Sequence, residues 1–365
     1  MIRALKSSGL QVAAVKIELL GESEGYARMN VREIKERARE RLRGSCRVCR
    51  VCDGRACAGE VPGIGGLLSG SSFQNNVETL AMYHLNMRTI HQVDQPDHAL
   101  QLFGRTFTTP VLVAPLTGAA YNLGGALSEE EFITALVEGA AAAGSCAFIG
   151  DGADPDYFRL GLQAIKKAGK NGIAIIKPRA MEPLRERIRQ AEESGVLAVG
   201  IDIDGAGLVT MALKGQPVGP KSFYQLRELV KMTELPFILK GIMTAQEAEM
   251  AVEIGAAAIV VSNHGGRVLD GTPGVAEVLP EIVERVKGEI IVFADGGIRS
   301  GVDALKMLAL GANAVLIGRP AIWGAFGHGA AGVKTIIKTM TEELRHGMLM
   351  TGCVNLKAVD YHIIY

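Results

Sequence analysis

Short apolar runs alternate with amphipathic stretches from residue 111 onward. Each run is apolar throughout, which is typical of parallel strands that are buried on both faces. The stretches between them have the 3.6-residue spacing of surface helices, as at 129–143, 183–194, 245–254, 275–286 and 301–310. The apolar runs are 111–114, 147–149, 173–176, 198–201, 237–239, 258–261, 290–294 and 314–317.

Eight strand–helix units predict an α/β fold, a closed (β/α)8 TIM barrel over residues 111–365. A doubly wound sheet is the alternative, but the count of eight and the placement of polar residues favour the barrel. In a barrel, the residues that follow the strands meet at one face, where active sites are built. Polar residues follow nearly every run: 115–117, 150–151, 177–179, Asp202, Lys240, 262–267, 295–299 and 318–319.

Residues 1–110 do not follow this rhythm. Asn30 and Glu33 form a capping pair, which predicts a helix from this point through Arg43. A stretch rich in Cys and Gly then continues to Ser72. We therefore expect 1–110 to form a helical, Cys-rich cap that packs on the barrel.

Composition narrows the class of protein. The 39 basic and 39 acidic residues balance, so nucleic acid and membrane surfaces are not expected partners. The chain has no apolar run long enough to span a bilayer, and residues 1–20 do not resemble a signal peptide. We expect a cytoplasmic protein. Its six cysteines are then expected to be thiols or metal ligands rather than a disulfide framework.

The segment Ser262-Asn263-His264-Gly265-Gly266-Arg267 follows the sixth strand and carries the strongest chemical signal. A buried Arg can clamp a carboxylate with two parallel hydrogen bonds, and a His can accept a proton near neutral pH. A Gly-rich turn with an incidental His is the alternative.

The loops after the seventh and eighth strands predict a phosphate site. They read Asp295-Gly296-Gly297-Ile298-Arg299 and Gly318-Arg319, and barrels frequently bind phosphate between these two positions. Surface salt bridges would be the alternative role for the two arginines. Lys240, which ends the fifth strand, can stabilise negative charge on a reduced flavin; alternatively it is a buried partner of Asp202 or a Glu.

From about residue 235 to 353 the chain closely resembles the FMN-dependent 2-hydroxy-acid oxidases and dehydrogenases, the glycolate and lactate oxidase family. The matching segments are 236–242, 262–267, 269–271, 295–299, 310–312 and 318–320. Weaker similarity extends back to 111–115 and 200–202. The resemblance implies bound FMN, a 2-hydroxy acid as substrate, either lactate- or glycolate-like or larger, and a homotetramer.

The resemblance also implies roles for single residues. His264 would be the catalytic base, Asp202 would hold the protonated His, and Arg267 would bind the substrate carboxylate. Lys240 would contact the flavin ring. The other residues that the resemblance places around the cofactor are Ala114, Pro115, Lys177, Ser262, Asp295, Gly297, Arg299, Gly318 and Arg319.

The chain departs from the family at three points. Lys177 and Arg179 stand where the family has a Gln and a Tyr after the third strand. The second carboxylate-binding Arg is absent from 203–208, and no substrate-binding Tyr occurs between Arg43 and Ser72. Arg179 is a candidate replacement for that Arg in substrate binding. Charge balance at the barrel rim is the alternative role for Lys177 and Arg179.

Cys46, Cys49, Cys52 and Cys57 lie within twelve residues. Their spacing is similar to the first cysteines of a ferredoxin and predicts a possible [4Fe–4S] site. Zinc is an alternative, although its usual Cys pairs are further apart. Reduced thiols or a redox-sensing disulfide are the remaining alternatives. A cluster beside FMN would favour a dehydrogenase that passes single electrons to a partner.

The sequence thus predicts an FMN-dependent oxidoreductase that converts a 2-hydroxy acid to the 2-oxo acid. Two other functions stay open. One is an FMN barrel with another reaction, such as an ene-type reduction or an isomerisation, as in the distantly similar type 2 isopentenyl diphosphate isomerases. The other is a redox sensor that uses the Cys46–Cys57 cluster.

Overall fold

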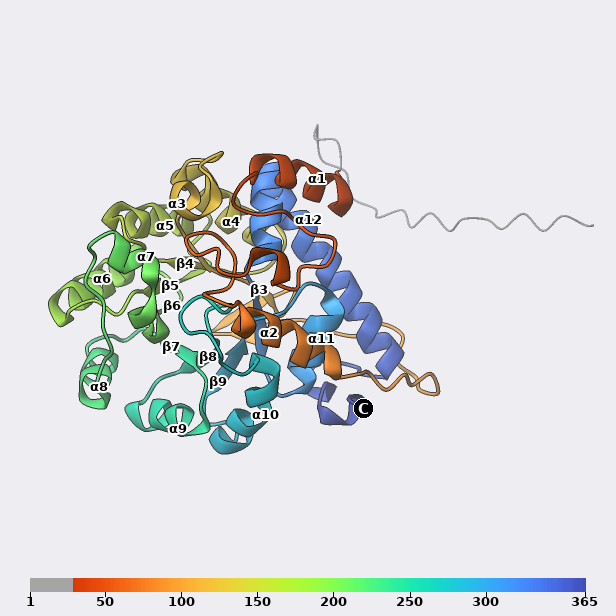
Figure 1. The fold of residues 1–365 in the computed structure, drawn as a ribbon. Helices are drawn as coiled ribbons and strands as arrows, with labels where there is room; N and C mark the ends of the chain where they lie inside the picture. The colour runs from red at the N-terminus through yellow and green to blue at the C-terminus, as the bar shows by residue number, and fades with distance from the viewer. Residues whose placement is uncertain (1–28) are drawn as a thin grey trace, which may run out of the picture.

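The computed structural model describes residues 29–365 and contains a closed barrel of eight parallel strands (Figure 1). This confirms the predicted (β/α)8 fold and excludes the doubly wound alternative. Around the barrel, the strands run in the order β10-β3-β4-β5-β6-β7-β8-β9. They are β3 (Val111–Leu116), β4 (Ala147–Gly150), β5 (Gly172–Ile176), β6 (Ala198–Asp202), β7 (Phe237–Ile242), β8 (Ala258–Val261), β9 (Ile291–Ala294) and β10 (Ala314–Ile317).

Helices surround the barrel, because each strand buries its outer side chains against a helix. The end of the surrounding layer, α12, is interrupted at His328 and Gly329, whose backbone angles are not helical. The helices of this layer are α4 (Glu129–Ala142), α5 (Pro155–Lys167), α6 (Met181–Ser194), α8 (Phe223–Lys231), α9 (Ala245–Ile254), α10 (Val275–Val286), α11 (Gly301–Ala309) and α12 (Arg319–Thr351).

The barrel interior is a packed apolar core. Leu112, Phe148 and Phe293 are buried inside it, and the two rings meet edge to face at 5.6 Å. The hairpin formed by β1 (Leu100–Leu102) and β2 (Arg105–Phe107) adds its apolar side chains to this core. The inside of the barrel is therefore filled, which leaves the carboxyl ends of the strands as the place for a site.

The segment before the barrel packs on its helical layer. Helix α1 (Val31–Arg41) begins with the predicted capping box of Asn30 and Glu33 and lies along α12 (Figure 1). Helix α2 (Ser71–Met82) lies against α10. The short turn η1 (Arg55–Cys57) lies between these helices in the chain. Residues 1–28, which include the part of the chain considered for a signal peptide, lie outside the described residues.

Short elements after two strands shape the top of the barrel. Helix α3 (Ala119–Leu123) follows β3, and the turn η2 (Ile203–Gly207) with helix α7 (Val209–Leu213) follows β6. The chain ends in the turns η3 (Leu356–Ala358) and η4 (Tyr361–Ile363). Across residues 29–365, no helix combines the length and apolar character that crossing a membrane requires.

Candidate active site

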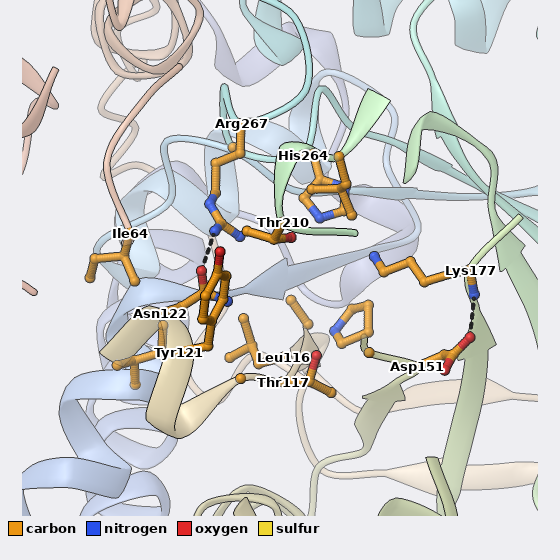
Figure 2. A pocket seen from close by; sticks show the side chains of 18 of the residues that line it. Ile64, Leu116, Thr117, Tyr121, Asn122, Asp151, Lys177, Thr210, His264 and Arg267 are labelled. Carbon is orange, nitrogen blue, oxygen red and sulfur yellow. Dashed lines mark hydrogen bonds between the residues drawn. The ribbon is translucent and has the colours of Figure 1, made fainter. Parts of the chain in front are cut away.

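A cavity of about 710 Å³ lies at the carboxyl ends of the strands (Figure 2). This volume is within the usual range of ligand and cofactor sites. Of the residues selected from the sequence for catalysis or for binding FMN or substrate, Arg179, Asp202 and Ser262 are not among its lining residues. The others do line it: Ala114, Pro115, Lys177, Lys240, His264, Arg267, Asp295, Gly297, Arg299, Gly318 and Arg319.

The loop after β8 places His264 at the cavity. His264 has a left-handed backbone, with φ of 58°, and the two glycines that follow it have φ of 64° and 78°. A non-glycine residue in this region is uncommon, and such residues concentrate at functional sites. The backbone N–H of His264 donates to Ser262 Oγ at 3.0 Å. Ser262, which is buried behind the cavity wall, therefore stabilises the backbone of this turn.

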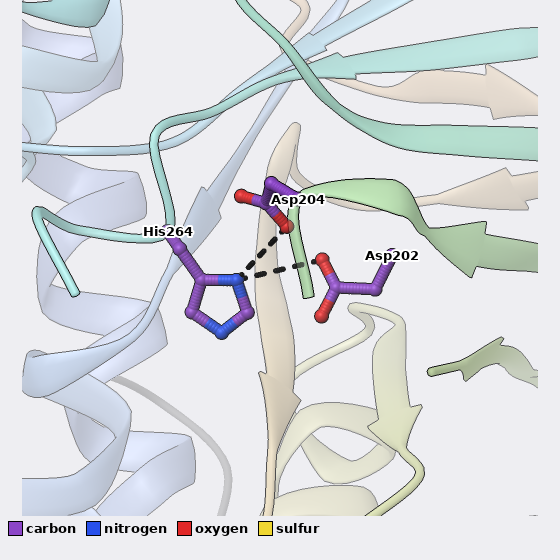
Figure 3. A group of neighbouring side chains, drawn as sticks. All are labelled: Asp202, Asp204 and His264. Atoms are coloured by element: carbon purple, nitrogen blue, oxygen red, sulfur yellow. Dashed lines mark hydrogen bonds and ion pairs between the residues drawn. The ribbon is translucent and has the colours of Figure 1, made fainter. Parts of the chain in front are cut away.

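Two carboxylates face one nitrogen of the His264 ring (Figure 3). Nδ1 lies 3.0 Å from Asp204 Oδ1 and 3.5 Å from Asp202 Oδ1. Sequence reasoning selected Asp202 and missed Asp204, which is the nearer partner. The available signal was position alone: Asp204 comes two residues after Asp202 in the loop that ends β6.

Asp202 is the centre of a buried ion network. Its carboxylate accepts hydrogen bonds from Lys177 Nζ and, at 3.0 Å, from Lys240 Nζ. Burial opposes ionisation, but the two ammonium groups outweigh it and hold the pKa of Asp202 well below its usual value. Burial raises the pKa of Asp204, against the influence of Lys240. Lys240 thus combines both roles considered for it: it lines the cavity and pairs with Asp202.

Ligand atoms of Asp202, Asp204 and His264 lie within 4.8 Å of one another, a spacing that a metal ion could use. The two lysines argue against this use, because their ammonium groups already neutralise the Asp202 carboxylate. We therefore assign both carboxylates to the orientation of the imidazole ring.

Arg267 is partly buried and lines the same cavity. Its Nη2 donates to the Gly63 carbonyl at 2.8 Å and to Asn122 Oδ1 at 3.1 Å. Its Nε is buried and has no hydrogen-bond partner within residues 29–365. Burial lowers the pKa of Arg267 to about 10, so the group is still charged at neutral pH. A held guanidinium with a spare donor is suited to binding an anion.

The two Gly–Arg loops come together at the cavity wall, where Arg319 Nη2 also donates to the Gly265 carbonyl at 3.3 Å. Arg319 and Arg299 lie over the Phe73 ring, 3.6 and 5.6 Å from its centroid. Arg319 donates to the Ile64 carbonyl through Nε at 2.9 Å and Nη2 at 2.6 Å. Within the described chain, Arg299 Nε and Nη2 are buried without partners. Buried donors of this kind are costly unless a ligand satisfies them, and a phosphate group would do so.

Asp295 offers a matching acceptor near these loops. Its Oδ2 accepts from Ser262 Oγ at 2.9 Å, while Oδ1 is buried without a partner among residues 29–365. Burial raises the pKa of Asp295, with Lys240 acting in the opposite direction. The next residues, Gly296 and Gly297, have φ of 83° and 79°, and a side chain on either would collide with Asn76. The residues present fit a ligand with hydroxyl and phosphate groups.

Arg179 lies beside the cavity and its guanidinium is fully engaged. It donates to Asp151 through Nε at 2.7 Å, to Gln216 at 2.8 Å and to the Gly152 carbonyl at 2.6 Å. Arg187 also binds Asp151, at 3.2 Å. These contacts give no support to the role in substrate binding expected for Arg179, and they favour the alternative of charge balance.

Other cavity residues were missed by sequence reasoning. Tyr121 and Asn122, both from α3, line the cavity on the side of Arg267 (Figure 2). Lys214 lies with Nζ 4.5 Å from the centre of the Tyr121 ring. The only sequence signal was their position in the loop after the first barrel strand. Ile64, from the Cys-rich segment, also lines the cavity. No pattern in the sequence indicated this position.

A barrel with Gly–Arg loops at its last two strand ends, and with a His–Asp pair and a partly buried Arg at the same cavity, has the site features of a flavin-dependent oxidoreductase. The chain belongs to the FMN-dependent dehydrogenase family, whose model matches residues 64–218 and 209–365. FMN is therefore the cofactor that the family membership supports. The comparisons give no support to iron–sulfur.

Proteins that are similar to this chain are named as oxidases. The chain is 44% identical to mouse 2-hydroxyacid oxidase 1 over 162 residues, which is 44% of this chain and 43% of that enzyme. It is 32% identical to L-lactate oxidase from Nostoc sp. over 343 residues, covering 83% of this chain and 92% of the relative. A crystal structure of mandelate oxidase with benzoyl-formic acid superposes with a TM-score of 0.75 at 28% identity, covering 92% and 97% of the two chains.

Proposed function

We propose that this protein oxidises a small 2-hydroxy acid to the corresponding 2-oxo acid, with FMN bound in the 710 Å³ cavity. The observation that carries the proposal is that His264, Arg267 and the two Gly–Arg loops line one cavity. A base, a carboxylate clamp and a cofactor cradle are the parts that this reaction needs. The names of the relatives agree with this reaction rather than with an ene-type reduction, an isomerisation or a sensor.

His264 is assigned the role of base. Asp204 and Asp202 face Nδ1, which leaves Nε2 directed away from both carboxylates (Figure 3). With its proton on Nδ1, the ring would accept the proton of the substrate hydroxyl at Nε2. The two carboxylates then stabilise the imidazolium that forms, without moving a proton themselves.

Arg267 is assigned the substrate carboxylate. The contacts of Nη2 with Gly63 and Asn122 hold the guanidinium in place, and Nε remains for the anion. With the carboxylate bound there, the adjacent hydroxyl group would face His264 across the cavity. The acid is thereby positioned by two residues of one loop, three positions apart.

Arg299, Arg319 and Asp295 are assigned to FMN. Arg299 supplies two buried donors for phosphate, and Asp295 Oδ1 supplies an acceptor for a ribityl hydroxyl. Lys240 lies where it can offset negative charge on the flavin ring. When bound, FMN supplies the acceptor for the two electrons that leave the substrate. A homotetrameric assembly and a cytoplasmic location are further parts of the proposal, which native mass spectrometry and fractionation would test.

The test is anaerobic mixing of purified protein with a panel of 2-hydroxy acids, including lactate, glycolate and mandelate, while the visible spectrum is recorded. One acid should bleach the flavin band of the wild-type protein, and the 2-oxo acid should appear in equal amount. His264→Ala should retain FMN and bleach at least about 10²-fold more slowly. A flavin band that no acid bleaches would refute the proposed reaction, and bleaching of the variant at the wild-type rate would refute the role of His264.

A further inference from the structure

A second cavity lies beside the first and is surrounded by cysteines. Its lining residues include Cys46, Cys49, Cys52 and Cys57, all with free and partly buried thiols. The four come from the turns between α1 and α2, far in sequence from the barrel loops. We propose that this cavity holds a [4Fe–4S] cluster, ligated by the thiolates of these four residues.

The sequence spacing of Cys46, Cys49, Cys52 and Cys57 favours a cluster over a single zinc ion, whose usual Cys pairs are further apart in the chain. A tetrahedral zinc site with Zn–S bonds of about 2.3 Å brings its sulfur atoms to about 3.8 Å from one another. The four thiols line one cavity and are partly buried, as the ligands of a buried cluster would be. A cubane cluster carries its ligands on separate iron atoms, so it accepts thiolates that stand further apart.

Two N–H groups near Cys46 are suited to a charged sulfur atom. The backbone N–H of Val48 donates to Cys46 Sγ at 3.3 Å. The indole of Trp323 is only 2% exposed and lies close to the Cys46 thiol, and its Nε1 has no hydrogen-bond partner in the described chain. A buried N–H without a partner is unusual, and a sulfur ligand of the cluster would satisfy it.

The loop that presents the cysteines is held in a strained form. Val48 has a φ of 43°, a left-handed conformation that is a genuine outlier for a β-branched residue. Arg39 of α1 fixes this turn by donating to the carbonyls of Arg47 and Val48 at 3.1 and 2.9 Å. Cys46 and Cys49 flank this turn, so their ligation of a cluster would add to these hydrogen bonds in compensating for the strain.

Positive charge at the cavity wall is suited to an anionic cluster. Arg319 lines both this cavity and the larger one, and so does Ile64. The Arg319 guanidinium would therefore offset charge from the cluster on one side and from phosphate on the other. Arg47 lines the rim, where its guanidinium is paired with Glu60 at 2.7 Å.

The test is iron and sulfide analysis of the full-length protein, purified anaerobically and then incubated with ferric iron, dithiothreitol and sulfide, a mixture that supplies both the ferric and the ferrous iron of a resting cluster. We expect about four irons and four sulfides per chain, a broad absorption band under the flavin bands, and an electron paramagnetic resonance signal after reduction with dithionite. Cys49→Ser should lose most of the iron and this signal. Cys353→Ser is the matched control, because Cys353 is buried elsewhere and its bonds to Thr351 and Ala358 suit a hydroxyl group.

FMN content and the rate of flavin bleaching are measured on the same samples. Loss of the cluster can therefore be distinguished from failure of the proposed oxidation of a 2-hydroxy acid. FMN should stay bound in Cys49→Ser, which shows that the chain has folded. Protein that takes up no iron or sulfide after this treatment would overturn the proposal. So would stoichiometric zinc, or a cluster that persists when Cys49 and Cys52 are both replaced by Ser.

Discussion

The His264 ring is held by Asp204 more closely than by Asp202, with Nδ1 at 3.0 Å from the first carboxylate and 3.5 Å from the second. Asp204→Asn keeps the shape of the side chain but removes the charge that stabilises the imidazolium. We expect the rate of flavin reduction by the substrate to fall by about 10²- to 10⁴-fold. A rate of flavin reduction equal to that of the wild-type protein would contradict this assignment.

Asp202→Asn should instead reduce stability. Asp202 compensates two buried ammonium groups, on Lys177 and Lys240, and removal of one member of such a network costs about 3–5 kcal/mol. Its pKa in the folded protein lies below the unfolded value near 3.9, so its contribution is present above that pH and is lost as the pH falls through the lower folded value. Urea unfolding at neutral pH and in acid measures both effects. A variant as stable as wild type would show that the lysines find other partners.

Arg267→Lys separates binding of the substrate from binding of FMN. A lysine keeps the charge but cannot reproduce the planar fork, and Asn122 and Gly63 would no longer hold it. We expect the KM for the 2-hydroxy acid to rise by about 10- to 100-fold, the equivalent of one charged hydrogen bond, while FMN content is unchanged. Steady-state kinetics and the visible spectrum measure the two quantities. Normal KM would exclude Arg267 as the carboxylate clamp.

Alkaline pH should also raise the KM of the wild-type protein for the 2-hydroxy acid. Burial lowers the pKa of Arg267 to about 10, so its positive charge is present below that pH and is lost above it. If only the charged guanidinium binds the carboxylate, KM should rise about tenfold for each pH unit above 10. Arg319 has a pKa lowered to about 10 by burial as well, so retained FMN must be measured by filtration at each pH. A KM that stays constant from pH 9 to 11 would contradict the prediction.

Arg299→Ala tests the phosphate cradle. Arg299 carries two buried donors without partners in the described residues. Its loss should therefore weaken FMN binding more than it lowers the stability of the protein without FMN. We expect the dissociation constant of FMN, measured by quenching of flavin fluorescence, to rise by about 10- to 100-fold. Arg285→Ala is the control, because that arginine is half-exposed and pairs with Glu249 on the surface. Equal FMN affinity in the two variants would exclude Arg299 from the cofactor site.

Much of the fold was readable from the sequence, because the barrel strands are buried on both faces and so form unbroken apolar runs. The run at 258–261 and the strand β8 (Ala258–Val261) coincide. The capping box at Asn30 and Glu33 was also readable, since it depends on side chains three positions apart. The hairpin of β1 and β2 was not, because its apolar residues are few and are buried only by the barrel interior.

The sequence predicts those site residues that lie together in one loop, but not the contacts between residues of different elements. His264 and Arg267 are close in sequence, so their convergence on one cavity follows from one turn. The choice between Asp202 and Asp204 depends on the path of η2, and the engagement of Arg179 depends on Asp151 from another strand end. Such pairings arise from the closure of the barrel, which no local pattern records.

Tyr121 is the candidate for the tyrosine that the Cys-rich segment lacks. It lines the cavity from α3, next to Asn122, and Figure 2 shows it on the Arg267 side. A hydroxyl group there can donate to the substrate carboxylate, so Tyr121→Phe should raise KM by about 3- to 10-fold, the value of one neutral hydrogen bond. FMN content and kcat should change little, because the ring and its contact with Lys214 remain. Tyr224→Phe, on the exposed face of α8, is the control. If KM is the same in both variants, a different group must complete the substrate site, and Tyr121 only closes the cavity wall.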